Sequence, residues 1–92
     1  MATAYCPALQ TERLILRPFR EDDVDAFHAF YQDPLSQALF GGDVSKADVW
    51  RRIALFHGHW ALKGFGIWAI EEKSTHRFAG YAGLWFPYEF AD

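Results

Sequence analysis

The sequence predicts an α+β fold in the order β-α-α-β-β, with a three-stranded antiparallel sheet and two helices. Three observations support this prediction. An opening segment alternates in the manner of a strand, two segments repeat apolar residues at helical spacing, and two apolar segments flank a short polar turn. Because strands and helices are segregated in this order, we expect both helices to pack on one face of the sheet.

The first strand and the first helix are predicted in the opening third of the chain. The strand covers Arg13–Phe19, and the acidic run Glu21–Asp23 follows it. Negative charge is favourable in the first turn of a helix, so we interpret this run through the helix dipole rather than as an acid–base cluster. Apolar residues then recur at helical spacing at Val24, Phe27 and Tyr31. Pro34 ends the helix, because the residue before a proline avoids the helical region.

The second helix is predicted over Lys46–Lys63. Ser45 and Asp48 have the spacing of a helix-capping pair, and Gly64 suits the left-handed residue that ends a helix. The apolar residues of this segment form one stripe, which predicts the face that packs against the sheet. The stripe consists of Val49, Ile53, Phe56 and Trp60.

The last two strands are predicted to form a hairpin. The apolar segments Gly66–Lys73 and Phe78–Phe86 are joined by the polar turn Ser74–Arg77. Strand alternation places Phe78 and Tyr81 on opposite faces of the sheet.

Two further features of this hairpin carry expectations. Glu71 lies near a polar strand end, where we expect it to be solvated. Gly80 and Gly83 lie inside the last strand, where glycine often marks a bulge or a close approach of two backbones.

Charge and cysteine content disfavour several classes of protein. A formal net charge of −3 argues against nucleic acid as a partner. The single cysteine, Cys6, excludes an internal disulfide and permits a reducing compartment. The opening segment has no signal-peptide pattern, and the apolar stretch Phe78–Phe86 is too short to span a membrane. We therefore expect a cytoplasmic protein that binds neither nucleic acid nor membranes.

The histidines and tryptophans do not indicate a metal or nucleophile site. His57 and His59 are two residues apart within the second helix, so their side chains point about 200° apart around its axis. They therefore cannot bind the same metal ion. A G-x-S-x-G motif is missing from the sequence. We therefore expect no metal site, and the spacing of Trp60, Trp68 and Trp85 favours a place in the core.

Two ordered motifs resemble the GNAT superfamily of acetyl-CoA-dependent N-acetyltransferases. In the branch that contains the ribosomal-protein N-terminal acetyltransferases, a T-E-R-L-x-L-R strand precedes an acidic E-x-D helix start, as Thr11–Arg17 and Glu21–Asp23 do here. The family's next hairpin, G-x-W-A-I-x-x-K followed by x-x-G-x-x-G-L, is similar to Gly64–Phe86. The resemblance covers Leu9–Phe86 and implies transfer of an acetyl group from acetyl-CoA to an amine.

The resemblance also implies which half of the family fold is present. In the family, a fourth strand and a loop of the type Q/R-x-x-G-x-G/A hold acetyl-CoA, and the tyrosine that commonly serves as general acid lies later still. Met1–Asp92 contains no such loop before a predicted helix, because the glycines of Gly80–Gly83 lie inside the predicted last strand. We therefore expect residues 1–92 to form a single partial domain, the N-terminal half of the fold. Such a fragment would have no cofactor-binding residues and would be inactive alone.

By the same resemblance, this half contributes part of the pocket for the acceptor amine, which is a small molecule or a peptide. Two regions are expected to line the pocket, namely the loop between the helices and the segment around and after the end of the last strand. The predicted substrate-binding residues are Phe40, Gly41, Gly42, Trp85, Tyr88 and Glu89.

Two alternatives stay open on the sequence. One is a small binding or self-assembly module that uses the half-fold without catalysis, and the other is one half of a split enzyme. The last strand is apolar on both sides, whereas two helices cover only one face of a sheet. We therefore expect either a homo-oligomer or pairing with the missing C-terminal half.

Overall fold

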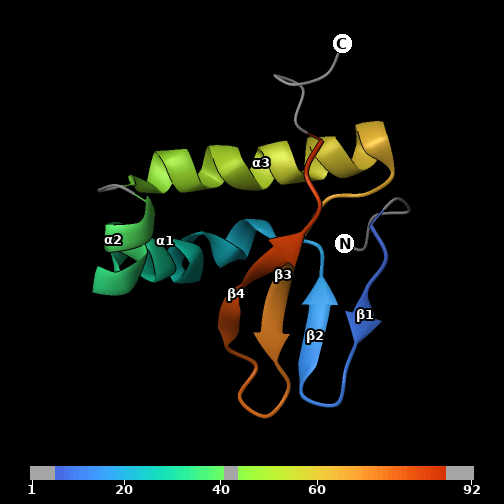
Figure 1. The fold of residues 1–92 in the computed structure, drawn as a ribbon, viewed down its shortest axis with the longest axis horizontal. Coiled ribbons are helices and arrows are strands. Elements are labelled where there is room, and N and C mark those ends of the chain that lie inside the picture. The colour runs from blue at the N-terminus through green and yellow to red at the C-terminus, as the bar shows by residue number, and fades with distance from the viewer. Residues whose placement is uncertain (1–5, 41–43, 87–92) are drawn as a thin grey trace.

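The computed structural model of the protein describes residues 6–40 and 44–86, and it has an α+β fold (Figure 1). Its elements, in chain order, are β1 (Leu9–Gln10), β2 (Leu14–Arg17), the 3-10 helix η1 (Glu21–Asp23), α1 (Val24–Gln32), α2 (Pro34–Phe40), α3 (Lys46–Lys63), β3 (Ile67–Glu72) and β4 (Phe78–Gly83). The four strands form one antiparallel sheet in the order β1-β2-β3-β4. The α+β class is confirmed, and the structure adds a short strand and a short helix to the predicted elements.

The two added elements follow from local backbone chemistry. β1 has two residues, which is too short to give an alternating pattern. α1 ends at Gln32, as the Pro34 signal predicted, but Pro34 then begins α2 because proline suits the first position of a helix. The Asp33 carboxylate accepts a hydrogen bond from the Leu35 backbone N–H at 3.1 Å and so caps the start of α2.

α3 begins and ends where the sequence predicted. The Ser45 hydroxyl oxygen accepts a hydrogen bond from the Asp48 backbone N–H at 3.1 Å, and Gly64 follows the helix with a φ of 76°. The predicted apolar stripe of α3 faces the core. Its members are Val49, Ile53, Phe56 and Trp60.

The core lies between the helices and one face of the sheet. Phe27 of α1 is fully buried, and its ring centroid lies 5.0 Å from that of Phe19 and 5.5 Å from that of Phe78. Figure 1 shows α1 and α3 side by side, with α1 in contact with β4 and α3 in contact with β3. This packing supports the expectation that the helices cover one face of the sheet.

A β-bulge in the hairpin changes the predicted faces of β4. Phe78 and Gly80 pair with two successive residues of β3, so Ala79 is an extra residue in the strand. The extra residue shifts the alternation by one, and Phe78 and Tyr81 both pack against Phe27, with ring centroids 5.5 and 5.4 Å away. The predicted placement of Phe78 and Tyr81 on opposite faces is therefore wrong, whereas the bulge expected at Gly80 is confirmed.

The opposite face of the sheet carries a row of apolar side chains. The strand register pairs Leu9 with Leu16 and Leu16 with Ile70. This row faces away from the core, because Ala69, the neighbour of Ile70, is fully buried on the helix side. Leu9 is 47% exposed, so apolar surface remains open on this face of the described sheet.

Candidate functional site

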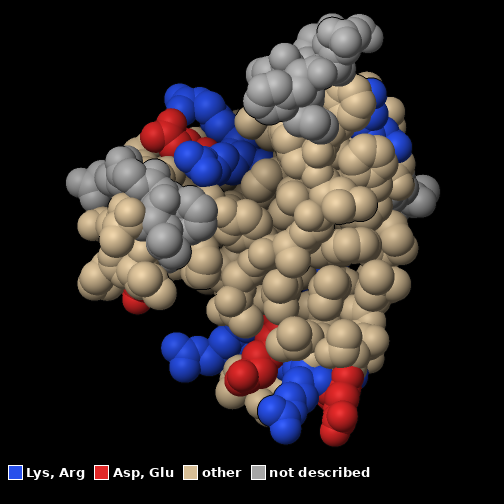
Figure 2. All heavy atoms as spheres, in the orientation of Figure 1, with Lys and Arg blue, Asp and Glu red and all other residues tan. Residues whose placement is uncertain are grey.

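A cleft of about 470 Å³ lies beside β4, which is an outer strand of the described sheet. Side chains from α1, α3, β3, β4 and the segment after β4 line it. They are Tyr31, Arg52, Leu55, Phe56, Ile67, Tyr81 and Trp85. Figure 2 shows that the surface over β3 and β4 is largely uncharged, with charged side chains gathered at its borders. The lining therefore combines an apolar wall with a few polar groups, as ligand sites commonly do.

The polar groups of the cleft form one connected network. Arg52 Nη1 donates a hydrogen bond to the Tyr31 hydroxyl at 2.9 Å, and Tyr31 donates to the Tyr81 hydroxyl at 3.3 Å. The Arg52 guanidinium also lies 4.9 Å from the centroid of the Tyr31 ring, within the range of a cation–π contact.

Tyr81 is a neutral group in this network. Burial raises the pKa of Tyr81 to about 12, and the hydrogen bond between the Tyr81 and Tyr31 side chains adds to the rise. Its hydroxyl is therefore protonated at neutral pH.

Trp85 is fixed at the rim of the cleft by His59 of α3. The two rings stack with centroids 4.2 Å apart and planes 16° apart. The Phe86 backbone N–H donates to His59 Nε2 at 2.9 Å, so Nδ1 carries the ring proton and donates to the Phe65 carbonyl at 2.8 Å. These contacts hold the chain after β4 against α3, while Trp85 stays 46% exposed.

A close backbone approach sets the path of the chain after β4. Gly83 has a φ of 153°, and a Cβ at this position would lie 2.1 Å from the Gly66 carbonyl oxygen. The same carbonyl accepts a hydrogen bond from the Leu84 N–H at 3.1 Å. The close approach expected at a strand glycine is therefore confirmed at Gly83, and it directs the following residues toward α3.

An apolar groove adjoins the cleft on the outward face of α3. It has a volume of about 510 Å³ and shares Leu55 and Trp85 with the cleft. Trp50 and Leu62, which also line the groove, are exposed. The cleft and the groove together make a continuous apolar surface from β4 to the outer side of α3.

Of the six predicted substrate-binding residues, Trp85 is the one whose side chain the structure places, and it lies at the cleft. Phe40 is the last residue of α2, and its backbone alone is described. The remaining four lie outside the described residues. They are Gly41, Gly42, Tyr88 and Glu89.

Sequence reasoning missed the three polar residues of the cleft. Tyr31 and Tyr81 were assigned only to packing or to a sheet face, and Arg52 was not singled out. A signal for Arg52 was present, because it is three residues after Val49 and four before Phe56 and therefore borders the apolar stripe of α3. A charged residue at such a position faces the junction between helix and sheet.

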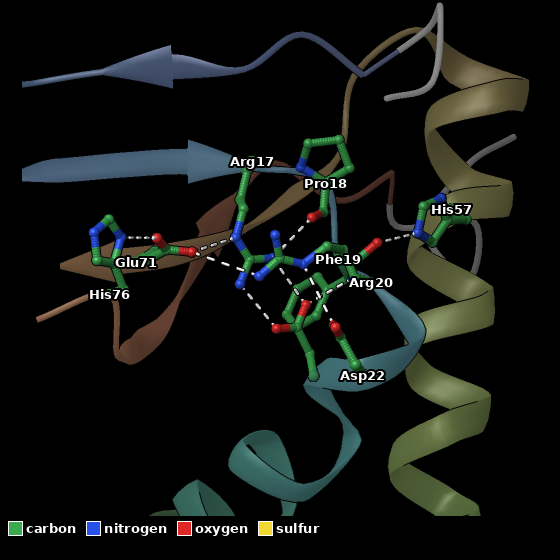
Figure 3. Close-up of polar contacts among 9 residues, drawn as sticks. Arg17, Pro18, Phe19, Arg20, Asp22, His57, Glu71 and His76 are labelled. Atoms are coloured by element: carbon green, nitrogen blue, oxygen red, sulfur yellow. Dashed lines mark hydrogen bonds and ion pairs between the residues drawn. The ribbon is translucent and has the colours of Figure 1, made fainter. Parts of the chain in front are cut away.

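A second polar cluster lies at the other end of the core, where β2 meets η1 (Figure 3). Arg17 forms a bidentate pair with Asp23, with both N···O distances 2.8 Å. Its Nε donates to Glu71 at 2.9 Å, and Nη1 also donates to the Pro18 carbonyl at 3.0 Å. Arg17, Asp23 and Glu71 are all buried, so this cluster ties β2, β3 and η1 together.

The electrostatics of this cluster favour the charged carboxylates. Burial alone would raise the pKa of Asp23, but hydrogen bonds from Arg17 and from the Arg20 backbone N–H outweigh burial and hold that pKa below its ordinary value. Hydrogen bonds from Arg17 and His76 lower the pKa of Glu71. The solvated placement expected for Glu71 is wrong, because Glu71 is buried and bound by Arg17. Asp23 lies in the first helical turn, as expected, and Arg17 binds its carboxylate in addition.

The remaining candidate chemistry is sparse in the described part of the chain. Within residues 6–40 and 44–86, no three His, Cys, Asp or Glu side chains are grouped to hold a metal ion. His57 is hydrogen-bonded to the Phe19 carbonyl. Burial raises the pKa of the Cys6 thiol to about 11, which disfavours a nucleophilic thiolate. The helices of the described segments are also too short or too polar to cross a bilayer.

Comparison with known proteins identifies the class to which this fold and cleft belong. The acetyltransferase (GNAT) domain family matches residues 13–92. The chain therefore belongs to the GNAT acetyltransferase family, as the sequence motifs predicted.

Solved structures of this family share the fold. An acetyltransferase from Agrobacterium tumefaciens is 30% identical, with a TM-score of 0.68 over 84% of this chain and 44% of that chain. A Bordetella pertussis protein assigned to the GNAT family is 22% identical, with a TM-score of 0.72 over 92% of this chain and 50% of its own. A Vibrio cholerae protein assigned as a ribosomal-protein-serine acetyltransferase is 16% identical, with a TM-score of 0.76 over 98% of this chain and 51% of its own. The chain thus spans about half the length of the solved structures it matches.

Proposed function

We propose that this chain is the acceptor-binding half of an N-acetyltransferase that transfers an acetyl group from acetyl-CoA to an amine. One observation carries the proposal: a family member with half the length of its solved neighbours has a cleft beside the outer strand β4. In such a reaction the amine nitrogen attacks the thioester carbonyl, the new C–N bond forms, and the thiol of CoA leaves with a proton.

The polar residues of the cleft suit binding of the acceptor rather than removal of its proton. An amine attacks as the neutral base, so its proton must pass to another group. Arg52 is a cation, and Tyr81 stays protonated at neutral pH. Neither side chain takes a proton from the amine, so we propose that the cleft binds and orients the acceptor while another group removes the proton.

The cofactor-binding half lies outside residues 1–92 in this proposal, because the one match to Q/R-x-x-G-x-G/A in them, Arg77–Ala82, runs into strand β4 rather than forming a loop that opens a helix. We predict that the 92-residue chain does not bind acetyl-CoA with micromolar affinity. Calorimetric titration tests this prediction. The matched sample is a chain extended by the coding sequence that follows codon 92, which should bind acetyl-CoA and acetylate amines. Micromolar binding by the 92-residue chain, lost when the pantetheine arm is removed, would contradict the proposal.

We further propose that another polypeptide pairs with β4, either the complementary half of the fold or a second copy of this chain. An outer strand presents unpaired N–H and C=O groups, and here the cleft and the row of Leu9, Leu16 and Ile70 add open apolar surface. For the 92-residue chain alone we predict a homo-oligomer at low micromolar concentration. Sedimentation equilibrium measures this, and a single species of 10.6 kDa would contradict it. With one buried cysteine, the proposed location is the reducing cytoplasm.

A further inference from the structure

Arg52 differs from the neighbouring cations in having no carboxylate partner among residues 6–40 and 44–86. Lys46 pairs with Asp25 at 2.8 Å, and Arg51, the residue before Arg52, pairs with Asp48 at 2.7 Å. Among the ion pairs of the described residues Arg52 takes no part, although it borders the cleft. Its polar contact is instead the neutral hydroxyl of Tyr31.

The lining of the cleft supplies further groups that suit an anion. A guanidinium has five N–H donors, and the bond to Tyr31 uses one of them. The Tyr81 hydroxyl, 3.3 Å from that of Tyr31, also borders the cleft and adds a neutral O–H group to its lining. No acidic residue is among the described residues that line the cleft, and the walls next to Arg52 are the apolar Leu55, Phe56 and Trp85. An ion pair is stronger beside such walls than in open solvent.

We propose that the cleft binds a ligand with a carboxylate beside an apolar group, with the carboxylate on Arg52 and the apolar group against Trp85 and Phe56. Taken together with the proposed function, this assigns the acceptor as an amine that also carries a carboxylate, in contrast to a polycation. A polyamine would bring positive charge next to Arg52 without a carboxylate to bind it. An amine, a carboxylate and an apolar group occur together in a free apolar amino acid, and also in a peptide whose second residue is acidic.

A pair of probes with the same shape tests the binding inference on the 92-residue chain. The first is 3-phenylpropionate, and the second is 3-phenylpropionamide, which lacks the charge. Titrations are followed by the indole N–H signals of Trp50 and Trp85 in nitrogen-15 NMR spectra. We expect a saturable shift at Trp85 and about five- to ten-fold tighter binding of the carboxylate, the preference that one charged hydrogen-bonded pair at a half-open site gives.

Three arginine variants locate that preference. Arg52→Gln should bind both probes equally, whereas Arg51→Gln, the matched control, should keep the preference of the parent chain. Arg52→Lys keeps the charge but loses the planar fork, and it should retain a reduced preference. If Arg52→Gln does not fold, the carboxylate preference of Arg52→Lys tests the inference in its place. Equal binding of the two probes by the parent chain, an unshifted Trp85 signal, or an unchanged preference in Arg52→Gln would each overturn the inference.

Two further pairs of ligands distinguish the sources of the carboxylate. Tighter binding of phenylalanine than of phenylalaninamide points to a free amino acid. Tighter binding of Phe-Asp-amide than of Phe-Asn-amide points to a peptide terminus. Preference for the charged partner in either pair supports the inference, and preference in neither pair overturns it for amine acceptors. The proposed function fails separately: an extended chain that keeps the Arg52 preference but acetylates no amine would overturn acetyl transfer and leave the anion site standing.

Discussion

Arg17 and Arg52 place the same guanidinium in opposite surroundings. Arg17, at the end of β2, is buried and binds two carboxylates and one carbonyl of its own chain. Arg52, on α3, is exposed and donates to a neutral tyrosine hydroxyl at the border of a cleft. Both residues lie where a helical segment meets the sheet, so position alone does not separate their roles.

The difference shows how partner chemistry distinguishes a structural arginine from a binding one. A buried guanidinium is costly unless its charge is matched, and Asp23 and Glu71 match that of Arg17. Arg52 lies near solvent, which stabilises its charge without a carboxylate. The chain therefore tolerates an unmatched cation at the cleft, where a ligand can supply the missing charge.

The largest effect is expected from Arg17→Met. This change removes the cation that binds Asp23 and leaves Glu71 with the contacts of Arg20 at 3.7 Å and His76 at 3.0 Å. Breaking such a buried pair costs about 3–5 kcal/mol of unfolding free energy. Urea unfolding followed by circular dichroism measures it. Arg51→Met is the matched control, because Arg51 pairs with Asp48 on the exposed face of α3, and such pairs contribute about 1 kcal/mol or less. Similar losses in the two variants would show that the Arg17 cluster does not hold β2, β3 and η1 together.

Acid should weaken the fold through the same cluster. The pKa values of Asp23 and Glu71 lie below their ordinary values of 3.8 and 4.5, so the unfolded chain takes up protons first as the pH falls. The stabilisation is complete above about pH 4.5 and is lost progressively below it. Urea midpoints at pH 7, 5 and 3.5 measure this loss. In Arg17→Met, burial would raise the pKa of Asp23, so the acid loss should shrink or reverse. An equal loss in both proteins would contradict the assignment.

The smallest effect is expected from Arg52→Gln. The change removes one hydrogen bond and one cation–π contact at an exposed site, which together contribute about 1 kcal/mol or less. Thermal and urea unfolding measure the change in stability, while the probe titrations measure the change in binding. A loss as large as that of Arg17→Met would mean that Arg52 holds the fold, and the comparison between the two arginines would fail.

The sequence predicted the elements best where the deciding residues are neighbours in the chain. Both ends of α3 were correct, because each signal acts on a residue a few positions away: Ser45 accepts from the Asp48 N–H, and the Gly64 N–H donates to the Trp60 carbonyl. The hairpin was also predicted correctly, but the predicted assignment of the β4 side chains to the two faces of the sheet was wrong. The alternation rule assumes that every successive residue of a strand points to the opposite face. The bulge at Ala79 breaks this rule, and it appears only in the pairing of β4 with β3.

The polar contacts that matter most join residues far apart in the chain. Glu71 is 54 residues from Arg17, and Tyr81 is 50 residues from Tyr31. Local sequence patterns predicted each of these side chains separately, either as exposed to solvent or as part of the apolar packing. Trp85 could be predicted at the site because the family resemblance extends to the end of the hairpin. Arg52 could not, since its role depends on which strand lies opposite α3.

The bulge at Ala79 makes the hairpin sensitive to insertions and deletions rather than to substitutions. Ala79 is exposed, and many side chains fit there without touching the core. Removing the residue altogether would restore regular alternation, so Phe78 and Tyr81 could no longer both face α1. One aromatic ring would then turn to the open face of the sheet, and either the core would lose Phe78 or the cleft would lose Tyr81. The length of this strand, more than the identity of its exposed residue, thus keeps the core and the cleft together.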